Sequence, residues 1–193
     1  MPTSTASATD QLSVAQPSTV QPATPPRPGL DDLVARIREQ ADWAGRPLDT
    51  AVSVADLLRA RLPSLELLTA EERAYVGPTY ARHLLHSEAR FSVVAIVWQP
   101  GQLTEIHDHI AWCTFAVLQG TEFETLYRDH GDHLTEIGRV ANEAGDVSGF
   151  APPGDIHKVH NTGDVTAISL HVYGADLGTS PESVRRVYDL PIR

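Results

Sequence analysis

Two histidines, His107 and His109, lie two residues apart in a segment whose pattern is typical of a β-strand. Residues i and i+2 of a strand point to the same face, so both imidazoles can reach one ion while Asp108 points away. A second segment, Pro152 to Asn161, supplies a third histidine, His157. Three neutral imidazoles suit Fe, Zn, Cu or Ni better than Mg or Ca. The spacing therefore predicts a transition-metal site and leaves the choice among these metals open.

The residues around these histidines resemble the two sequence motifs of the cupin family, a small double-stranded β-helix barrel. The resemblance implies a mainly β, jelly-roll-like fold. One departure is informative, because Cys113 stands where the cupin pattern has a glutamate ligand. The residues that carry the resemblance are Gly101, His107, His109, Gly120, Gly145, Pro152, Gly154, His157 and Asn161.

One branch of the cupins, the thiol dioxygenases with cysteine dioxygenase as their type, replaces that glutamate with cysteine. The chain is similar to this branch from about Tyr75 to Tyr173. Ser169, His171 and Tyr173 alternate, so they face one side of a strand. They resemble the Ser-His-Tyr relay of the family, which implies that Tyr173 places its hydroxyl near the O₂ or the substrate and donates the hydrogen bond on the oxygen side. Two other roles for His171 stay open, a fourth metal ligand or a core histidine.

Arg82, preceded by Tyr80, resembles the arginine with which cysteine dioxygenases bind the substrate carboxylate. A planar guanidinium can bind a carboxylate through two parallel hydrogen bonds. The related 3-mercaptopropionate dioxygenases generally carry glutamine at this place. The resemblance therefore implies a mononuclear Fe(II) enzyme that oxidises L-cysteine with O₂ to cysteine sulfinic acid. Gly174 keeps 3-mercaptopropionate or another small thiol open as the substrate, because mammalian-type cysteine dioxygenases continue differently after this tyrosine.

Other interpretations differ in class. A non-enzymatic cupin that binds a metal or ligand is one alternative, and a Zn- or Ni-loaded isomerase is another. The resemblance also implies that Cys113 lies near Tyr173, where some cysteine dioxygenases form a thioether between the two side chains. An inert buried thiol is the alternative for Cys113.

Composition excludes several partners. The chain has 193 residues, a formal net charge of -10 and a sequence pI near 5.2. Such an acidic protein is a poor partner for nucleic acid or an anionic membrane surface. No apolar run approaches the ~18 residues of a membrane span. A single cysteine excludes an internal disulfide and favours a reducing, cytoplasmic setting. We expect a monomer or a small homo-oligomer with small-molecule substrates.

The pattern of the chain predicts how these residues are positioned. Residues 1–29 are rich in Pro, Ser and Thr and are predicted to be a disordered tail. Residues 30–193 are predicted to form one cupin domain, with a helical part over about 30–85 and a β-barrel over about 86–175. Residues 174–193 are predicted to pack outside the barrel. The predicted strands cover residues 90–99, 107–118 (as one or two strands), 122–128, 134–140, 146–150, 157–161 and 165–173.

Three helices are predicted before the barrel. The first covers residues 30–44, where apolar residues recur mostly at helical spacing. The second covers residues 54–61, with Ser53 as its N-cap. The third begins after Thr69, where Glu72 occupies the capping-box position. These helices are expected to cover one side of the barrel and to lead into Arg82.

Overall fold

In the described residues, all ten strands follow the helices in the chain, and strands of both sheets line the site. The computed structural model describes residues 25–193. Its helices are α1 (Leu30–Gln40), α2 (Pro47–Ala60) and α3 (Ala70–Arg73), with a 3₁₀ turn at Leu65–Leu67. Its strands are β1 (Ala81–Ser87), β2 (Ser92–Trp98), β3 (His107–His109), β4 (Cys113–Gln119), β5 (Thr121–Asp129), β6 (Leu134–Glu143), β7 (Val147–Phe150), β8 (His157–His160), β9 (Ala167–Tyr173) and β10 (Val184–Val187).

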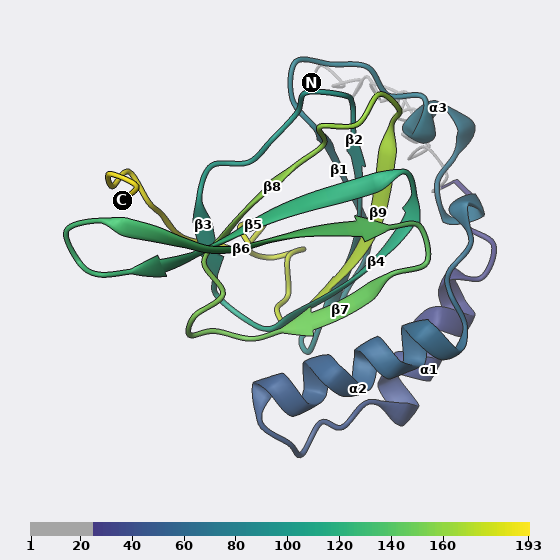
Figure 1. Cartoon of the computed structure of the whole chain (residues 1–193). Helices are drawn as coiled ribbons and strands as arrows, with labels where there is room; N and C mark the ends of the chain where they lie inside the picture. The colour runs from purple at the N-terminus through teal and green to yellow at the C-terminus, as the bar shows by residue number, and fades with distance from the viewer. Residues whose placement is uncertain (1–24) are drawn as a thin grey trace, which may run out of the picture.

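The strands form two antiparallel sheets of five strands each. One sheet has the order β1-β2-β9-β4-β7, and the other has the order β10-β3-β8-β5-β6. From β2 onward, most strands that follow one another in the chain lie in opposite sheets, so the chain winds around a barrel (Figure 1). This is the arrangement of a cupin double-stranded β-helix. The predicted mainly β cupin fold with helices outside it is confirmed.

Strands β2 and β9 are buried along their whole length, because each face meets a different part of the core. Alternate residues of a strand point to opposite faces. On β2, Val93 and Val97 therefore pack in the hydrophobic cluster shared with the helices. Val94 and Trp98 pack in the second cluster, together with Tyr173. The interior face of the first sheet thus forms one wall of the site.

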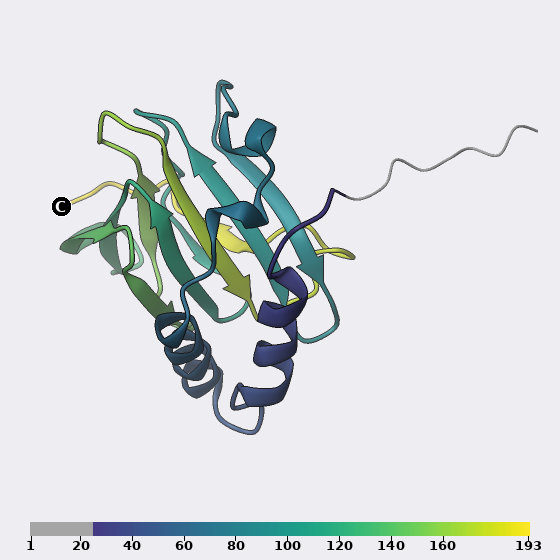
Figure 2. The same cartoon turned by 90° about the vertical axis from the view of Figure 1, so that its right-hand side faces the viewer.

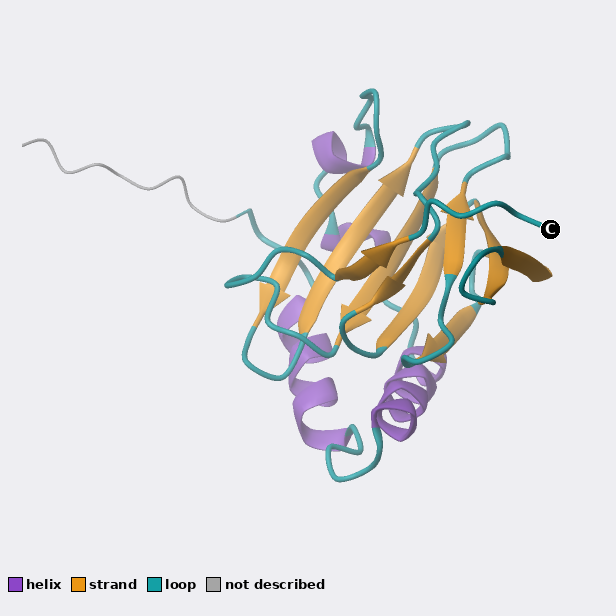
Figure 3. Ribbon diagram, turned by 90° about the vertical axis from the view of Figure 1, so that its left-hand side faces the viewer, coloured by secondary structure: helices purple, strands orange, loops and turns teal. Residues whose placement is uncertain are grey.

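Helices α1 and α2 lie outside the sheets, side by side (Figures 2 and 3). Helix α2 packs on β4 and β7 at a point where backbones meet closely. The Thr114 hydroxyl donates a hydrogen bond of 2.7 Å to the Ala51 carbonyl. A Cβ at Gly149 would lie 2.8 Å from that same oxygen. Glycine on β7 is therefore required for this close approach of α2.

The helix boundaries differ in part from the predicted ones. Helix α1 ends at Gln40 instead of residue 44. Helix α2 begins at Pro47 instead of Val54, because proline suits the first turn and Asp49 hydrogen-bonds back to Arg46. Ser53 therefore lies within the helix and is not its N-cap. The third helix is confirmed, with reciprocal capping between Thr69 and Glu72.

Two predictions about segments inside the domain are corrected. Strand β1 begins at Ala81 and pairs with β2, so the helical part ends well before residue 85. The segment predicted to pack outside the barrel contains β10, which pairs with β3 and completes the second sheet. Long-range pairing with a neighbouring strand decides both elements, and local propensity does not report it.

The N-terminal prediction is tested only in part. Residues 1–24 of the predicted disordered tail lie outside the described residues. In the described part, Arg27 makes two hydrogen bonds to the Glu72 carboxylate, of 2.9 and 2.7 Å, and a third to a backbone carbonyl. Residues 25–29 are therefore anchored to α3 and are not a free tail. Among residues 25–193, no helix is both long and apolar enough to cross a membrane.

Candidate metal centre

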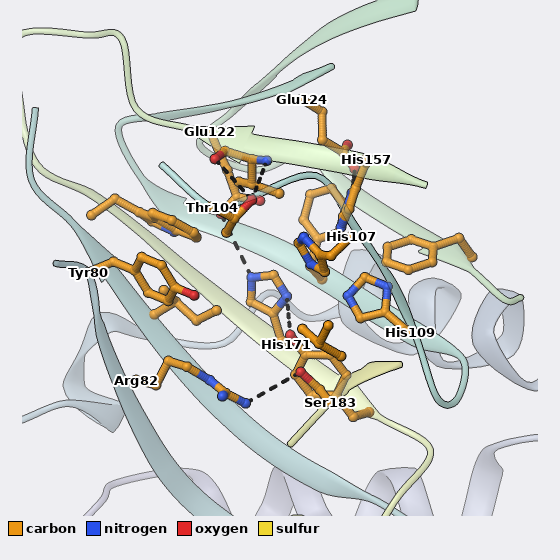
Figure 4. Close-up of a pocket in the computed structure, with 17 residues that line it drawn as sticks. Tyr80, Arg82, Thr104, His107, His109, Glu122, Glu124, His157, His171 and Ser183 are labelled. Atoms are coloured by element: carbon orange, nitrogen blue, oxygen red, sulfur yellow. Dashed lines mark hydrogen bonds and ion pairs between the residues drawn. The ribbon is translucent and has the colours of Figure 1, made fainter. Parts of the chain in front are cut away.

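Three buried histidines from two adjacent strands converge in the barrel (Figure 4). Strand β3 supplies His107 and His109, and β8 supplies His157 directly opposite His107. One nitrogen from each ring lies within 4.8 Å of the others. As predicted, the two β3 histidines point to the same face of the strand, and Asp108 between them points away.

Each ring uses its Nδ1 atom to hold an outer partner. The pairs are His107 with the Glu105 carbonyl at 2.9 Å, His109 with the Asp155 carboxylate at 3.1 Å, and His157 with the Glu124 carboxylate at 2.6 Å. Carbonyl and ionised carboxylate oxygens only accept hydrogen bonds, so each Nδ1 carries the proton. The lone pair of each Nε2 is left for an ion. Outer partners of this kind orient the ligands of metal sites.

Two of the histidines, His107 and His109, are held neutral, as metal ligands must be. Burial, reinforced by the neighbouring imidazoles, lowers the pKa of His107 to about 3. Burial also lowers the pKa of His109, although Asp155 opposes the shift. Burial disfavours the charged form of Glu124, but hydrogen bonding from His157 outweighs it and brings the Glu124 pKa below its usual value. The negative charge of the site therefore lies on the carboxylates behind the histidines and not on the ligands themselves.

The environment of the His157 Nε2 atom shows whether this site fits a metal. This atom is buried and has no hydrogen-bond partner among residues 25–193. Leaving such an atom unpaired costs about 1–3 kcal/mol. A metal ion coordinated by the three Nε2 atoms would remove that cost. The donor set fits a transition metal such as Fe or Zn, and the histidines by themselves do not select one.

The pocket around the histidines is lined by residues of both sheets. Arg82 lines it from β1 and, within residues 25–193, donates one side-chain hydrogen bond, to the Ser183 hydroxyl at 3.5 Å. No carboxylate of the described chain lies within ion-pair distance of this guanidinium. Tyr80 lines the pocket beside Arg82 and packs on Trp98 with ring centroids 4.4 Å apart. An arginine without an acidic partner in a pocket suits an anionic ligand.

The predicted relay residues are in contact on the interior face of β9. His171 Nε2 lies 2.9 Å from the Ser169 hydroxyl, and Nδ1 lies 3.5 Å from the Tyr173 hydroxyl. Cys113 stands opposite Tyr173 in the β4–β9 register, and its sulfur lies 3.8 Å from His171 Nδ1. Burial raises the pKa of both Cys113 and Tyr173 well above their usual values. The structure brings these residues together, and their roles stay predictions.

Several residues of the site were not anticipated from the sequence. Glu124 and Asp155 hold ligand histidines, Glu122 accepts a hydrogen bond from Ser169, and Ser183 contacts Arg82. Glu122 and Glu124 could have been noticed in the sequence, because they occupy alternate positions of one predicted strand and therefore share a face. Ser183 gave no signal, because it belongs to the segment predicted to pack outside.

Asp108 anchors the outer side of β3. It accepts hydrogen bonds from Arg185 of β10 and, at 2.8 Å, from the Tyr188 hydroxyl. Its carboxylate is almost fully buried. The C-terminal segment therefore holds the strand that carries two of the three ligand histidines.

The fold and the site define a cupin with a buried three-histidine metal centre. The family model for cysteine dioxygenase type I matches residues 70–183, which is more than half of the chain. The chain belongs to the cysteine dioxygenase type I family.

Solved structures of the same fold are similar to this chain at low sequence identity. A protein with a double-stranded β-helix domain from Klebsiella pneumoniae is 21% identical, with a TM-score of 0.45 over 56% of this chain and 89% of its own. A cupin superfamily protein from Desulfitobacterium hafniense is 16% identical, with a TM-score of 0.43 over 57% and 85%. A protein from Thermus thermophilus is 19% identical, with a TM-score of 0.44 over 56% and 95%.

Proposed function

We propose that this protein is an Fe(II)-dependent thiol dioxygenase that converts L-cysteine and O₂ into cysteine sulfinic acid. The observation that carries the proposal is the presence, in one pocket, of three converging histidines and of Arg82, which has no acidic partner among residues 25–193. The metal site has the donors that would hold iron, and Arg82 has the charge that would hold a carboxylate. Membership of the cysteine dioxygenase type I family supports the assignment.

The histidines determine the charge of the centre. A bound Fe(II) would acidify a coordinating thiol and activate O₂. Because the three candidate ligands are imidazoles and no carboxylate is among them, the chain adds no negative charge among the ligands. A substrate thiolate would supply that charge, which favours a thiol over a neutral ligand.

Arg82 would orient the substrate. Its guanidinium can bind the carboxylate of cysteine through two parallel hydrogen bonds, with the Ser183 hydroxyl beside it. Tyr173 places a protonated phenol in the same pocket, and Tyr80 and Trp98 close one wall with aromatic surface. The buried pocket holds the reacting sulfur away from bulk water.

The overall reaction balances without another reactant. Both atoms of O₂ are transferred to the sulfur, which is oxidised from a thiol to a sulfinic acid. The sulfur gives up all four electrons that O₂ takes, so no external reductant is needed. The partners proposed for this chain are therefore a small thiol and O₂.

Substitution of Arg82 tests the assignment of substrate. We expect Arg82→Gln to lower kcat/KM for L-cysteine by about 100-fold, the equivalent of ~2.7 kcal/mol for a lost charged hydrogen-bond pair. Arg82→Lys keeps the charge without the planar fork and should recover only part of the loss. Arg139→Gln, which breaks a surface ion pair on β6, is the matched control and should leave kinetics unchanged.

The alternatives make different predictions in the same assay. An unchanged rate with cysteine in Arg82→Gln would contradict the carboxylate role. Equal or greater activity with 3-mercaptopropionate would keep the dioxygenase and replace its substrate. Failure of the iron-loaded protein to consume O₂ with any thiol would favour the non-enzymatic cupin, and metal analysis of the purified protein would test for a Zn or Ni enzyme.

A further inference from the structure

A buried carboxylate, that of Glu122, lies next to Ser169, at the end of the Ser169–His171–Tyr173 hydrogen-bonded series that is farther from Tyr173. Glu122 lies on β5 with only 2% of its surface exposed. Its Oε2 accepts a hydrogen bond of 2.5 Å from the Ser169 hydroxyl. The same oxygen lies 3.8 Å from His171 Nε2 (Figure 4). Neither the predicted relay nor the proposed reaction uses this residue.

The hydrogen bonds around Ser169 fix the direction of the chain. A serine hydroxyl has one proton to donate and two lone pairs that accept. Its proton goes to Glu122, and one lone pair receives the Trp98 Nε1 proton, a group that only donates, at 3.3 Å. The second lone pair is left for His171 Nε2 at 2.9 Å. His171 Nε2 must therefore carry a proton.

The tautomer of His171 then decides what Tyr173 can do. A neutral imidazole protonated on Nε2 has an accepting lone pair on Nδ1. Within residues 25–193, the Tyr173 hydroxyl and the Cys113 thiol face this atom, at 3.5 and 3.8 Å, and burial keeps both protonated. A thiol is the weaker donor of the two, so the Tyr173 hydroxyl takes the lone pair and directs its proton away from the pocket. The oxygen that it presents to the pocket accepts hydrogen bonds.

We propose that Glu122 is a positioning residue that fixes His171 in the Nε2-protonated tautomer and so makes the Tyr173 oxygen an acceptor for the amino group of the substrate. This inference rests on the proposed function and extends it to substrate choice. An amino thiol such as cysteine has the N–H donor that this oxygen requires, and 3-mercaptopropionate has none. Tyr173 contacts the substrate as an acceptor, which differs from a role as donor to oxygen.

The tautomer can be measured without turnover. In metal-free protein labelled with ¹⁵N-histidine, long-range ¹H–¹⁵N correlation spectra distinguish protonated from unprotonated ring nitrogens, and the His171→Phe variant assigns the signals. We expect Nε2 of His171 to be protonated and Nδ1 to be unprotonated in the wild-type chain. Glu122→Met, which has a similar shape and no acceptor, should move the proton to Nδ1. Glu122→Gln keeps an accepting oxygen and should retain the wild-type tautomer.

The control is Glu124→Gln, two residues along the same strand, which should leave the His171 signals unchanged because Glu124 holds His157. A proton on His171 Nδ1 in the wild-type protein would overturn the proposal. An unchanged tautomer in folded Glu122→Met would overturn it as well. If that variant does not fold, the wild-type spectrum alone still decides.

Kinetics supply the functional readout. In Glu122→Met, the ratio of kcat/KM for L-cysteine to that for 3-mercaptopropionate should fall about tenfold, the equivalent of one hydrogen bond. Glu122→Gln should rescue most of the ratio. An unchanged ratio in the folded Met variant would overturn the link to substrate choice. If the wild-type protein oxidised neither thiol, the proposed function would fail while the tautomer measurement would still stand.

Discussion

At the scale of single residues, the metal centre depends on which nitrogen of each histidine carries a proton. His107, His109 and His157 each donate through Nδ1 to a carbonyl or carboxylate, so each is held in the tautomer that leaves Nε2 free. The outer acceptors also fix the rotation of the rings. The ligand set is therefore oriented before an ion binds, and its affinity depends on residues that do not touch the metal.

Glu124→Gln tests this dependence. Its 2.6 Å partner His157 would lose a charged acceptor and become a weaker ligand. We expect the affinity for Fe(II) to fall about tenfold or more, as for other outer-shell substitutions. Anaerobic equilibrium dialysis with metal analysis would measure it. Glu136→Gln, a surface glutamate paired with Arg139, is the control, and equal iron affinity in Glu124→Gln and the control would contradict the assigned role.

At the scale of elements, the site is assembled from strands that are distant in the chain. Strand β3 is only three residues long and lies between β8 and β10. It is held from outside through Asp108, which accepts hydrogen bonds from Arg185 and Tyr188. The C-terminal segment thus completes the sheet and brings Ser183 to Arg82.

Removing the Tyr188 hydroxyl measures how firmly this strand is held. Tyr188→Phe deprives the buried Asp108 carboxylate of one donor, and hydrogen bonds to charged groups contribute about 1.5–3 kcal/mol. We expect the free energy of unfolding, measured in urea, to fall by about 2 kcal/mol. Tyr75→Phe removes a hydroxyl that makes no hydrogen bond within residues 25–193 and should change little. Equal losses in the two variants would show that the Asp108 contact does not stabilise the strand.

At the scale of the whole molecule, the regular strands were predictable and the interior polar groups were not. The alternation in residues 122–128 predicted a strand without saying which face lies inside, and the structure buries Glu122 and Glu124 and leaves Phe123 half-exposed. Hydrophobic patterning fails here because the buried histidines and Ser169 provide partners for carboxylates. Strand geometry predicted the shared face of His107 and His109, and the resemblance to the second cupin motif added His157.

Other features depend on contacts between distant segments. Strand β10 is mostly exposed and rich in arginine, so its sequence carries no alternation from which a strand can be recognised. Strand β1 was placed in the helical part because only its pairing with β2 makes it a strand. Arg27 is ordered because Glu72, 45 residues later, receives its guanidinium. Such pairings are tertiary, and local sequence does not encode them.

The Arg27–Glu72 pair predicts how stability changes with acid. Hydrogen bonding from Arg27 lowers the pKa of Glu72 to about 2, from an ordinary value of 4.5. A lowered pKa in the folded state gives stability that is fully present above about pH 4.5 and is lost as the pH falls toward 2. In Glu72→Gln, glutamine can still take the glutamate's place in the capping box, but the negative charge is removed.

We expect Glu72→Gln to be less stable than the wild type at neutral pH, on the order of 1–2 kcal/mol after solvent screening. The difference should shrink between pH 4.5 and 2, where the wild-type carboxyl also becomes neutral. Urea unfolding at a series of pH values would measure it. A difference that stays constant across this range would show that the ion pair does not contribute.

The central claim is that this three-histidine cupin is an iron enzyme that oxidises cysteine. Its most direct test is O₂ consumption by the Fe(II)-loaded protein, offered L-cysteine and 3-mercaptopropionate in parallel, with mass detection of the sulfinate. The account predicts cysteine sulfinic acid, with one O₂ consumed per product and a clearly slower reaction with 3-mercaptopropionate. A preference for 3-mercaptopropionate would contradict the substrate assignment, and no O₂ consumption with either thiol would contradict the enzyme itself.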